Sequence, residues 1–129
     1  MNARRWLSDA LIRAIHADQI REHGGLPGIR EPGLLASALD RPAQRLHYEP
    51  QSDLAILAAA YAYGIARNHP FVDGNKRVAF QAMYVFLGLN GLRIEAEEDE
   101  VVRLILALAD GKVEEPALAQ WIREHTVQR

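Results

Sequence analysis

Apolar residues recur along most of the chain with the spacing expected for helices. In the first such stretch they fall three or four positions apart, starting after Ser8 and stopping at Gly24–Gly25. This is the pattern of an amphipathic helix with a serine N-cap and a glycine stop. Residues 53–68 are apolar on nearly every side, which is typical of a buried central helix, and Ser52 is its expected cap. The pattern predicts an all-α fold.

The remaining elements are predicted to be shorter. Helical spacing or an opening proline indicates four further helices, and a short extended piece lies between two of them: helices at 34–39, 78–89, 97–109 and 116–125, and the extended piece at 92–94. Arg41–Pro42 is expected to interrupt the first of these helices, because proline has no N–H to donate and its ring crowds the preceding turn. Residues 44–51 are expected to be irregular, and a short frayed tail is expected after His125.

The composition is that of a small globular protein. With 129 residues, 49% of them hydrophobic and 25% charged, the chain is expected to form a single domain, 1–129, with its own core. The formal net charge of −2 gives no basic surface for nucleic acid. There is no cysteine, the first residues show no signal-peptide pattern, and the longest apolar run, 54–66, falls short of the roughly 18 residues that indicate a membrane span. We therefore expect a cytoplasmic protein that contacts neither membrane nor nucleic acid directly.

The densest group of chemically active side chains lies at residues 69–77, His-Pro-Phe-Val-Asp-Gly-Asn-Lys-Arg, between two predicted helices. The proline should move His69 out of the helical region, so that the first helix ends there. Gly74 lies where the next helix begins, and the unpaired N–H groups and dipole of a helix start suit an anion. That dipole disfavours the cations Lys76 and Arg77 by a few tenths of a kcal/mol each. A bound polyanion would offset this effect, so the stretch predicts a phosphate site.

Each residue taken alone has a simpler interpretation. Asp73, before a helix, is most often an N-cap. His69 is more often a satisfied polar residue at a helix end, and Gly74 and Asn75 are common in turns. Arg67 suits the negative end of a helix dipole without any ligand. These interpretations do not account for the complete set at this spacing.

The stretch resembles the signature of the Fic/Doc superfamily, His-x-Phe-x-Asp/Glu-Gly-Asn-Gly/Lys-Arg. Lys76 stands where AMP-transferring Fic enzymes usually have glycine, and Phe80 stands where they usually have a second arginine. These two residues make the chain more similar to the Doc (death-on-curing) toxin branch. The similarity extends to four other segments: 15–20, 24–30, 34–39 and 58–68. The resemblance implies a compact Fic/Doc helical bundle with the motif loop between two central helices, in which 44–51 is either a target-facing flap or a plain connection.

The resemblance also implies a reaction, the transfer of the γ-phosphate of ATP to a serine or threonine hydroxyl with magnesium (Mg²⁺) bound. His69 would accept the proton of the incoming hydroxyl, and Asp73 would hold Mg²⁺. Phosphate contacts are expected from backbone N–H groups, from cations and from the last turn of the preceding helix: Gly74, Asn75, Lys76, Arg77 and Arg67.

In the Doc branch the implied role is that of a toxin which phosphorylates elongation factor Tu and is neutralised by a Phd-like antitoxin. The chain has no Ser/Thr-x-x-x-Glu-Gly/Asn inhibitory motif of the kind that some Fic proteins carry. Control by a separate antitoxin segment is therefore the expectation. Two alternatives remain open, an AMP transferase on the same scaffold and a non-catalytic binding module. Lys76 and Phe80 count against the first, and the complete set of acid, base and cations counts against the second.

Overall fold

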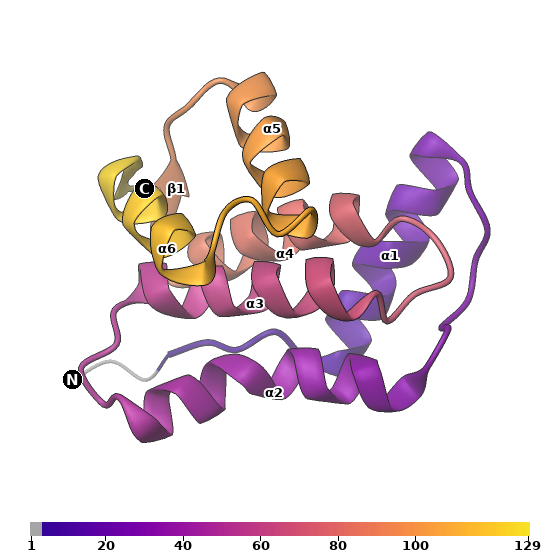
Figure 1. Cartoon of the computed structure of the whole chain (residues 1–129), viewed down its shortest axis with the longest axis horizontal. Coiled ribbons are helices and arrows are strands. Elements are labelled where there is room, and N and C mark those ends of the chain that lie inside the picture. The colour runs from indigo at the N-terminus through magenta and orange to yellow at the C-terminus, as the bar shows by residue number, and fades with distance from the viewer. Residues whose placement is uncertain (1–3) are drawn as a thin grey trace.

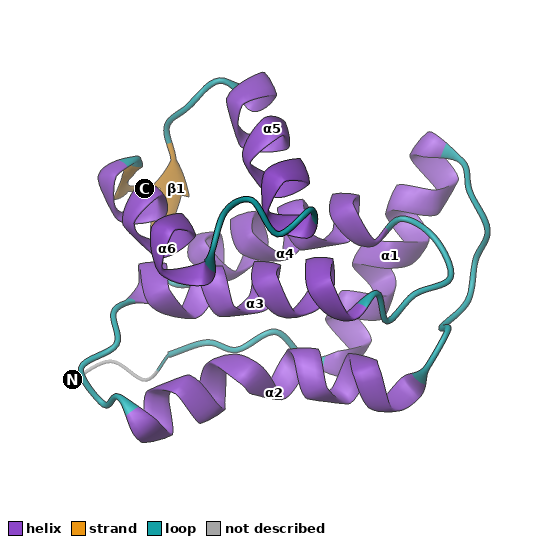
Figure 2. Cartoon of the chain, in the orientation of Figure 1, coloured by secondary structure: helices purple, strands orange, loops and turns teal. Residues whose placement is uncertain are grey.

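The computed structural model describes residues 4–129, so the first three residues of the expected 1–129 domain lie outside the described range (Figures 1 and 2). Six α-helices and one two-stranded sheet make up this described part. In chain order they are α1 (Asp9–His23), α2 (Pro32–Tyr48), α3 (Leu54–Asn68), α4 (Asn75–Leu89), β1 (Leu92–Ile94), α5 (Glu98–Ala109), α6 (Glu115–Glu124) and β2 (Thr126–Gln128). The predicted all-α class is confirmed.

The α3 helix forms the centre of the molecule. Figure 1 shows it running across the middle, with α2 on one side and α4, α5 and α6 on the other, and it contacts all four of these helices. Its alanine run, 58–60, has no exposed surface, which confirms the predicted burial. The small side chains let neighbouring helices approach on every side. None of the helices in residues 4–129, including the apolar α3, is both long enough and apolar enough to cross a lipid bilayer.

The α2 helix lies close to α3 at a glycine. A Cβ atom placed on Gly64 would lie 3.2 Å from the Cα atom of Ala38 and 3.4 Å from its carbonyl oxygen. Ala38 is fully buried on α2. The absence of a side chain at Gly64 therefore allows these two helices to lie close together. This distance affects the position of the C-terminal end of α3.

The α2 helix is longer than predicted, because it continues through Pro42. The expected interruption at Arg41–Pro42 is wrong, and so is the possible flap over 44–51, since residues 44–48 belong to the helix. Pro42 is one of the buried residues of the helix. Arg41 and Arg45, one turn apart, both form ion pairs with Glu115 of α6. These contacts hold the helix on both sides of the missing N–H.

The N-cap of α1 is the predicted residue, and the N-cap of α3 lies one residue after the predicted one. Ser8 caps α1 as predicted, because its hydroxyl accepts the N–H of Leu11 at 3.0 Å. The N-cap of α3 is Asp53, however, which accepts the N–H of Ile56 at 2.9 Å. The expected cap, Ser52, instead donates its hydroxyl to a carbonyl oxygen of the preceding turn. Either residue type can cap a helix, so the pattern could not distinguish neighbours.

The C-terminal residues are paired. β1 and β2 are antiparallel, with Leu92 opposite Gln128 and Ile94 opposite Thr126. The predicted extended piece at 92–94 is confirmed, and the frayed tail is wrong. Three-residue strands have too little alternation to be recognised from sequence when their partner lies more than thirty positions away.

The glycine contacts of α3 and α4 give a stability prediction. Replacing Gly64 with alanine gains up to about 1 kcal/mol of helix propensity, but the new methyl group meets the α2 backbone, and such overpacking costs about 1–3 kcal/mol. We expect Gly64→Ala to lower the free energy of unfolding measured in urea. Gly88→Ala is the matched control, because its methyl group would meet only the end of the Arg129 side chain, at 2.9 Å, which can move. A Gly64→Ala protein as stable as the Gly88→Ala protein would contradict this account of the α2–α3 contact.

Candidate active site

The α3 helix ends at His69, whose backbone leaves the right-handed helical region. Its φ of 51° and ψ of 57° are left-handed values, which are uncommon for a residue other than glycine and cost about 1–3 kcal/mol. Arg30 stabilises this turn, because it donates from Nε to the carbonyl oxygen of His69 and from Nη2 to that of Asn68, both at 2.7 Å. The predicted end of the helix at His69 is confirmed. The exposed imidazole lies where the loop begins.

The loop is anchored to the core by Phe71 and closed by Asn75. The Phe71 side chain is 1% exposed. The Asn75 side chain accepts the N–H of Phe71 and donates to its carbonyl oxygen, both at 2.9 Å. Asn75 thus uses its side chain to fix the loop and leaves its own N–H for a ligand. From the sequence, Asn75 is expected to contribute only its backbone N–H, and nothing in the pattern indicates the clamp on Phe71.

Asp73 holds an exposed carboxylate on two backbone donors. Its Oδ2 accepts the N–H of Leu26 at 3.2 Å, and its Oδ1 accepts the N–H of Gly74 at 2.9 Å. The bond from Leu26, then that from Gly74, lowers the pKa of Asp73 below its usual value of 3.8, with a smaller contribution from the charge of Arg77. The N-cap of α4 is Gly74, and no side chain caps this helix, so the N-cap interpretation of Asp73 is wrong. The carboxylate is ionised near neutral pH and has lone pairs left for a cation.

The first turn of α4 presents unpaired backbone donors. Gly74 is left-handed, with φ 80° and ψ 13°, and Asn75 after it is helical. A left-handed residue followed by a helical one turns successive N–H groups toward a common point, which is an anion-binding arrangement. The first N–H bonded within the helix is that of Val78, which donates to the carbonyl oxygen of Gly74 at 3.0 Å. The N–H groups of Asn75, Lys76 and Arg77 precede it and are oriented for a phosphate.

The two cations of this turn differ in their attachment. Lys76 is exposed. Arg77 is half-buried, and its Nη1 lies 3.4 Å from the carbonyl oxygens of both Gln19 and Gly24 at the end of α1. Arg77 therefore connects α4 to α1 as well as contributing charge to the site.

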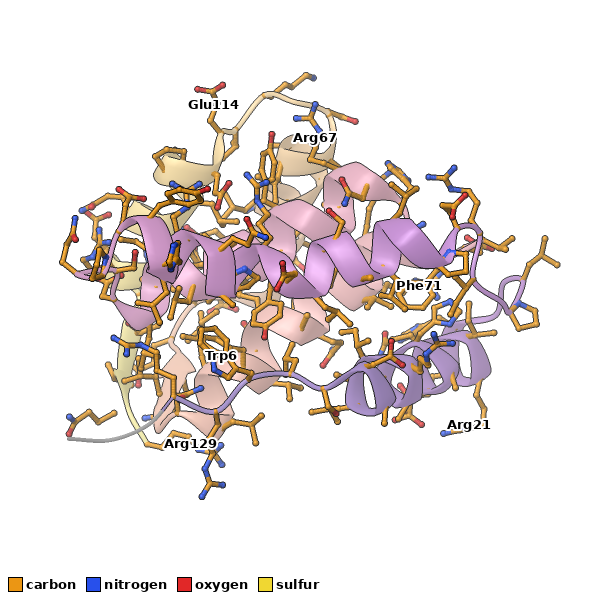
Figure 3. All side chains as sticks on the ribbon, turned by 90° about the horizontal axis from the view of Figure 1, so that it is seen from below. Trp6, Arg21, Arg67, Phe71, Glu114 and Arg129 are labelled. Atoms are coloured by element: carbon orange, nitrogen blue, oxygen red, sulfur yellow. The ribbon has the colours of Figure 1, made fainter. Side chains whose placement is uncertain are left out.

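The loop and the first turn of α4 line an open cavity of about 280 Å³. Seven residues line it: His69, Val72, Asp73, Gly74, Asn75, Lys76 and Arg77. The structure thus brings together six of the seven predicted site residues and adds Val72. It does not bring Arg67 to them. Arg67 lies with its guanidinium carbon 5.6 Å from the centre of the Tyr63 ring and lines a separate pocket with Glu114, and Figure 3 shows it beside Glu114 and apart from Phe71. Two helical positions turn a side chain by about 200°, so a residue two before His69 faces away from the loop.

Residues of the α1–α2 connection support the site, a role that was not predicted from the sequence. Figure 1 shows this connection beside the α3–α4 loop. The N–H of Arg30 donates to the carbonyl oxygen of Pro70 at 2.8 Å, the N–H of Val72 donates to that of Gly28 at 3.0 Å, and Ile29 forms a β-bridge with Phe71. The segment that covers the loop is therefore 24–31 and not 44–51. The only sequence signal for it was the similarity over 24–30.

The contact between Asp73 and the α1–α2 connection gives a prediction on two adjacent glycines. A Cβ atom on Gly25 would lie 2.7 Å from Oδ2 of Asp73, whereas one on Gly24 would meet nothing within 4 Å. Both glycines have positive φ, 118° and 81°, so alanine strains the backbone at either position. Only Gly25→Ala should displace the carboxylate from its donors and raise the pKa of Asp73 toward 3.8.

An NMR titration of the Asp73 carboxyl group measures this difference. Because the folded pKa is lowered, the stabilisation by Asp73 is present above pH 3.8 and is lost as the pH falls through the folded pKa. In the Gly25→Ala protein the contribution of Asp73 to this fall in stability should be absent, whereas in the Gly24→Ala protein it should be the same as in the parent chain. An unchanged Asp73 pKa in the Gly25→Ala protein would contradict the contact.

Comparison with known proteins identifies the family of this chain. Residues 6–87 match the model of the Fic/DOC family. The protein kinase doc of Escherichia phage P1 is 33% identical over 119 residues, which cover 92% of this chain and 94% of that protein. The toxin Doc of Mycolicibacterium smegmatis is 40% identical over 77 residues, 59% of each chain. With the motif loop held between α3 and α4, this chain belongs to the Fic/DOC family and to its Doc branch.

Proposed function

We propose that the chain is the toxin of a toxin-antitoxin pair and that it transfers the γ-phosphate of ATP to a serine or threonine hydroxyl of another protein. The observation that carries this proposal is the single cavity that combines a histidine, a carboxylate, unpaired helix N–H groups and two cations. The names of the two relatives, a protein kinase and a toxin, support it. Phosphoryl transfer depends mainly on positioning and on charge stabilisation, which such a cavity offers.

His69 and Asp73 have the roles of base and metal ligand in this proposal. The His69 imidazole is exposed at the cavity, where neutral histidine accepts a hydroxyl proton near pH 7. Within residues 4–129 there is no cluster of three or more metal-binding side chains. A single carboxylate beside a phosphate site fits Mg²⁺, which is usually held by one or two carboxylates together with phosphate oxygens and water. When bound, Mg²⁺ would neutralise charge on the phosphates.

The phosphates would lie on the N–H groups of the first turn of α4, with Lys76 as a point charge and Arg77 as a fork. These cations are placed against the helix dipole, and a bound polyanion offsets that repulsion. Arg67 has no part in this arrangement, because it lines another pocket.

Two residues of α4 favour transfer of the γ-phosphate of ATP over transfer at the α-phosphate. The Lys76 side chain lines both the cavity and the adjacent groove, and so fills space that a glycine would leave open. Phe80 stacks on Tyr84 with ring centres 4.8 Å apart and has no group that could bind a terminal phosphate. An AMP transferase on this scaffold remains the second candidate, supported by the family motif itself.

Labelled ATP tests the proposed reaction. The chain is incubated with purified elongation factor Tu, Mg²⁺ and ATP labelled at the α or the γ position, and we expect only the γ label to appear on protein. His69→Ala should abolish labelling, whereas His47→Ala, at an exposed histidine of α2 outside the cavity, should leave it unchanged. Label from the α position would replace the kinase with an AMP transferase. No label from either position would exclude this target and favour a binding module.

We further propose that a Phd-like antitoxin controls this activity from outside the chain, in the cytoplasm where a translation factor would be the target. A groove of about 350 Å³ lies between α1, α4 and α5, and Val102 and Leu106 on it are each 42% exposed. Lys76 and Arg77 line this groove as well as the cavity. An antitoxin segment that folds onto the groove would bury the apolar side chains and contact both cations.

Charge substitutions in the groove test its use by the antitoxin. The chain is coexpressed with the neighbouring reading frame as the candidate antitoxin, which should relieve toxicity for the parent chain. Val102→Asp and Leu106→Asp should prevent that relief, because a carboxylate would be buried at the interface. Leu89→Asp, at a similarly exposed residue at the end of α4, is the control and should remain neutralised. Full neutralisation of the Val102→Asp and Leu106→Asp proteins would place the antitoxin elsewhere.

A further inference from the structure

We propose that His16 of α1 is a positioning residue, which fixes the orientation of the Asp73–Gly74 peptide and thereby places both the carboxylate and the anion-binding N–H groups. His16 is 6% exposed and lies outside the motif. Its role in transfer rests on the proposed function. The structural part of the inference, the orientation of one peptide group, does not depend on that function.

The hydrogen bond of His16 defines its tautomer. Its Nε2 lies 2.9 Å from the carbonyl oxygen of Asp73. A carbonyl oxygen can only accept, so Nε2 must carry the proton and donate. An apolar side chain at this position could fill the same space but could not make the bond.

This bond determines where the Gly74 N–H points. In a planar trans peptide the C=O and N–H vectors are opposed. Because His16 holds the carbonyl oxygen of Asp73 on the α1 side, the Gly74 N–H is directed away from α1, and it donates to Oδ1 of Asp73 at 2.9 Å. A rotated peptide would remove this donor from the carboxylate and would change the direction of the chain that leads into the unpaired N–H groups of α4.

Ring stacking keeps His16 in place. The imidazole and the Phe71 ring are nearly parallel, with centres 3.9 Å apart and planes inclined by 9°. Phe71 is in turn clamped by the Asn75 side chain. A Cβ atom on Gly74 would lie 3.8 Å from Cδ2 and 4.0 Å from Nε2 of the imidazole, so the peptide lies against this edge of the ring.

The α1 helix supports the first turn of α4 at a second point. One turn after His16, the carbonyl oxygen of Gln19 lies 3.4 Å from Nη1 of Arg77. His16 and Gln19 are the buried polar residues of α1. His16 through its ring and Gln19 through its backbone carbonyl oxygen both contact the segment from Asp73 to Arg77, so this part of α1 supports the loop as well as filling the core.

Two substitutions separate the donor from the stacking. His16→Phe keeps a ring against Phe71 but removes the donor, whereas His16→Gln keeps a donor at the position of Nε2 but loses the ring. Misplacement of reacting groups by an ångström can lower a rate by about 100-fold. We expect His16→Phe to lower transfer by roughly ten- to 100-fold and to raise the KM for Mg²⁺-ATP with the KM for the protein target unchanged. His16→Gln should restore most of the transfer although it is the less stable protein.

The matched control is His125→Phe. His125 also stacks on an aromatic ring, that of Trp121 at 4.1 Å, and its Nδ1 lies 2.7 Å from a carbonyl oxygen, but it sits at the end of α6. This substitution should change neither transfer nor its dependence on Mg²⁺-ATP. If activity instead followed thermal stability across the His16 variants, with His16→Phe the more active, His16 would be a core residue only and the inference would be wrong.

NMR of the protein without nucleotide gives a readout that does not require the kinase. The Gly74 amide resonance should shift, and its hydrogen exchange should accelerate, in His16→Phe but not in His16→Gln or His125→Phe. An unchanged Gly74 amide in His16→Phe would overturn the inference even if the parent chain is an active kinase. Conversely, a parent chain that transfers no phosphate would overturn the proposed function, and the amide comparison would still decide the role of His16.

Discussion

The pairing between two connections, residues 28–30 and 70–72, is the interaction on which the site depends. Loops of this length between helices are usually mobile, yet here main-chain hydrogen bonds join them as in a small sheet. The α1–α2 connection then places Arg30 on the end of α3 and the Leu26 N–H on Asp73. The unusual backbone of His69 persists because the surrounding contacts determine it.

The electrostatics of the site are local. A chain with a formal net charge of −2 has no general attraction for anions. The attraction comes from one helix start whose donors are free and whose first turn carries two cations. Asp73 balances part of this charge, and its lowered pKa shows that the donors around it already favour a negative group. The same surroundings that stabilise a carboxylate suit phosphate oxygens.

Much of the fold and of the candidate site could be predicted from the sequence, because the strongest sequence signals are local. Helical spacing located the buried central helix, and the order of residues from His69 to Arg77 located the cavity. The prediction was wrong where a contact between distant residues overrides a local rule. Pro42 remains inside a helix because Arg41 and Arg45 are held by Glu115, seventy or more positions away. Arg67 is a different case, because helical geometry alone turns a residue two positions before His69 away from the loop. The contact of His16 with Asp73 spans 57 positions, and the similarity over 15–20 was its only sequence signal.

The cavity and the groove share Lys76 and Arg77, and this has a thermodynamic consequence. A ligand in either place changes the position or the charge of side chains that the other ligand would use. By linkage, the factor by which the first ligand alters the affinity of the second is also the factor by which the second ligand alters the affinity of the first. Occupancy of the anion cavity and occupancy of the α1–α4–α5 groove are therefore coupled equilibria, and the concentration of one ligand sets the apparent affinity of the other.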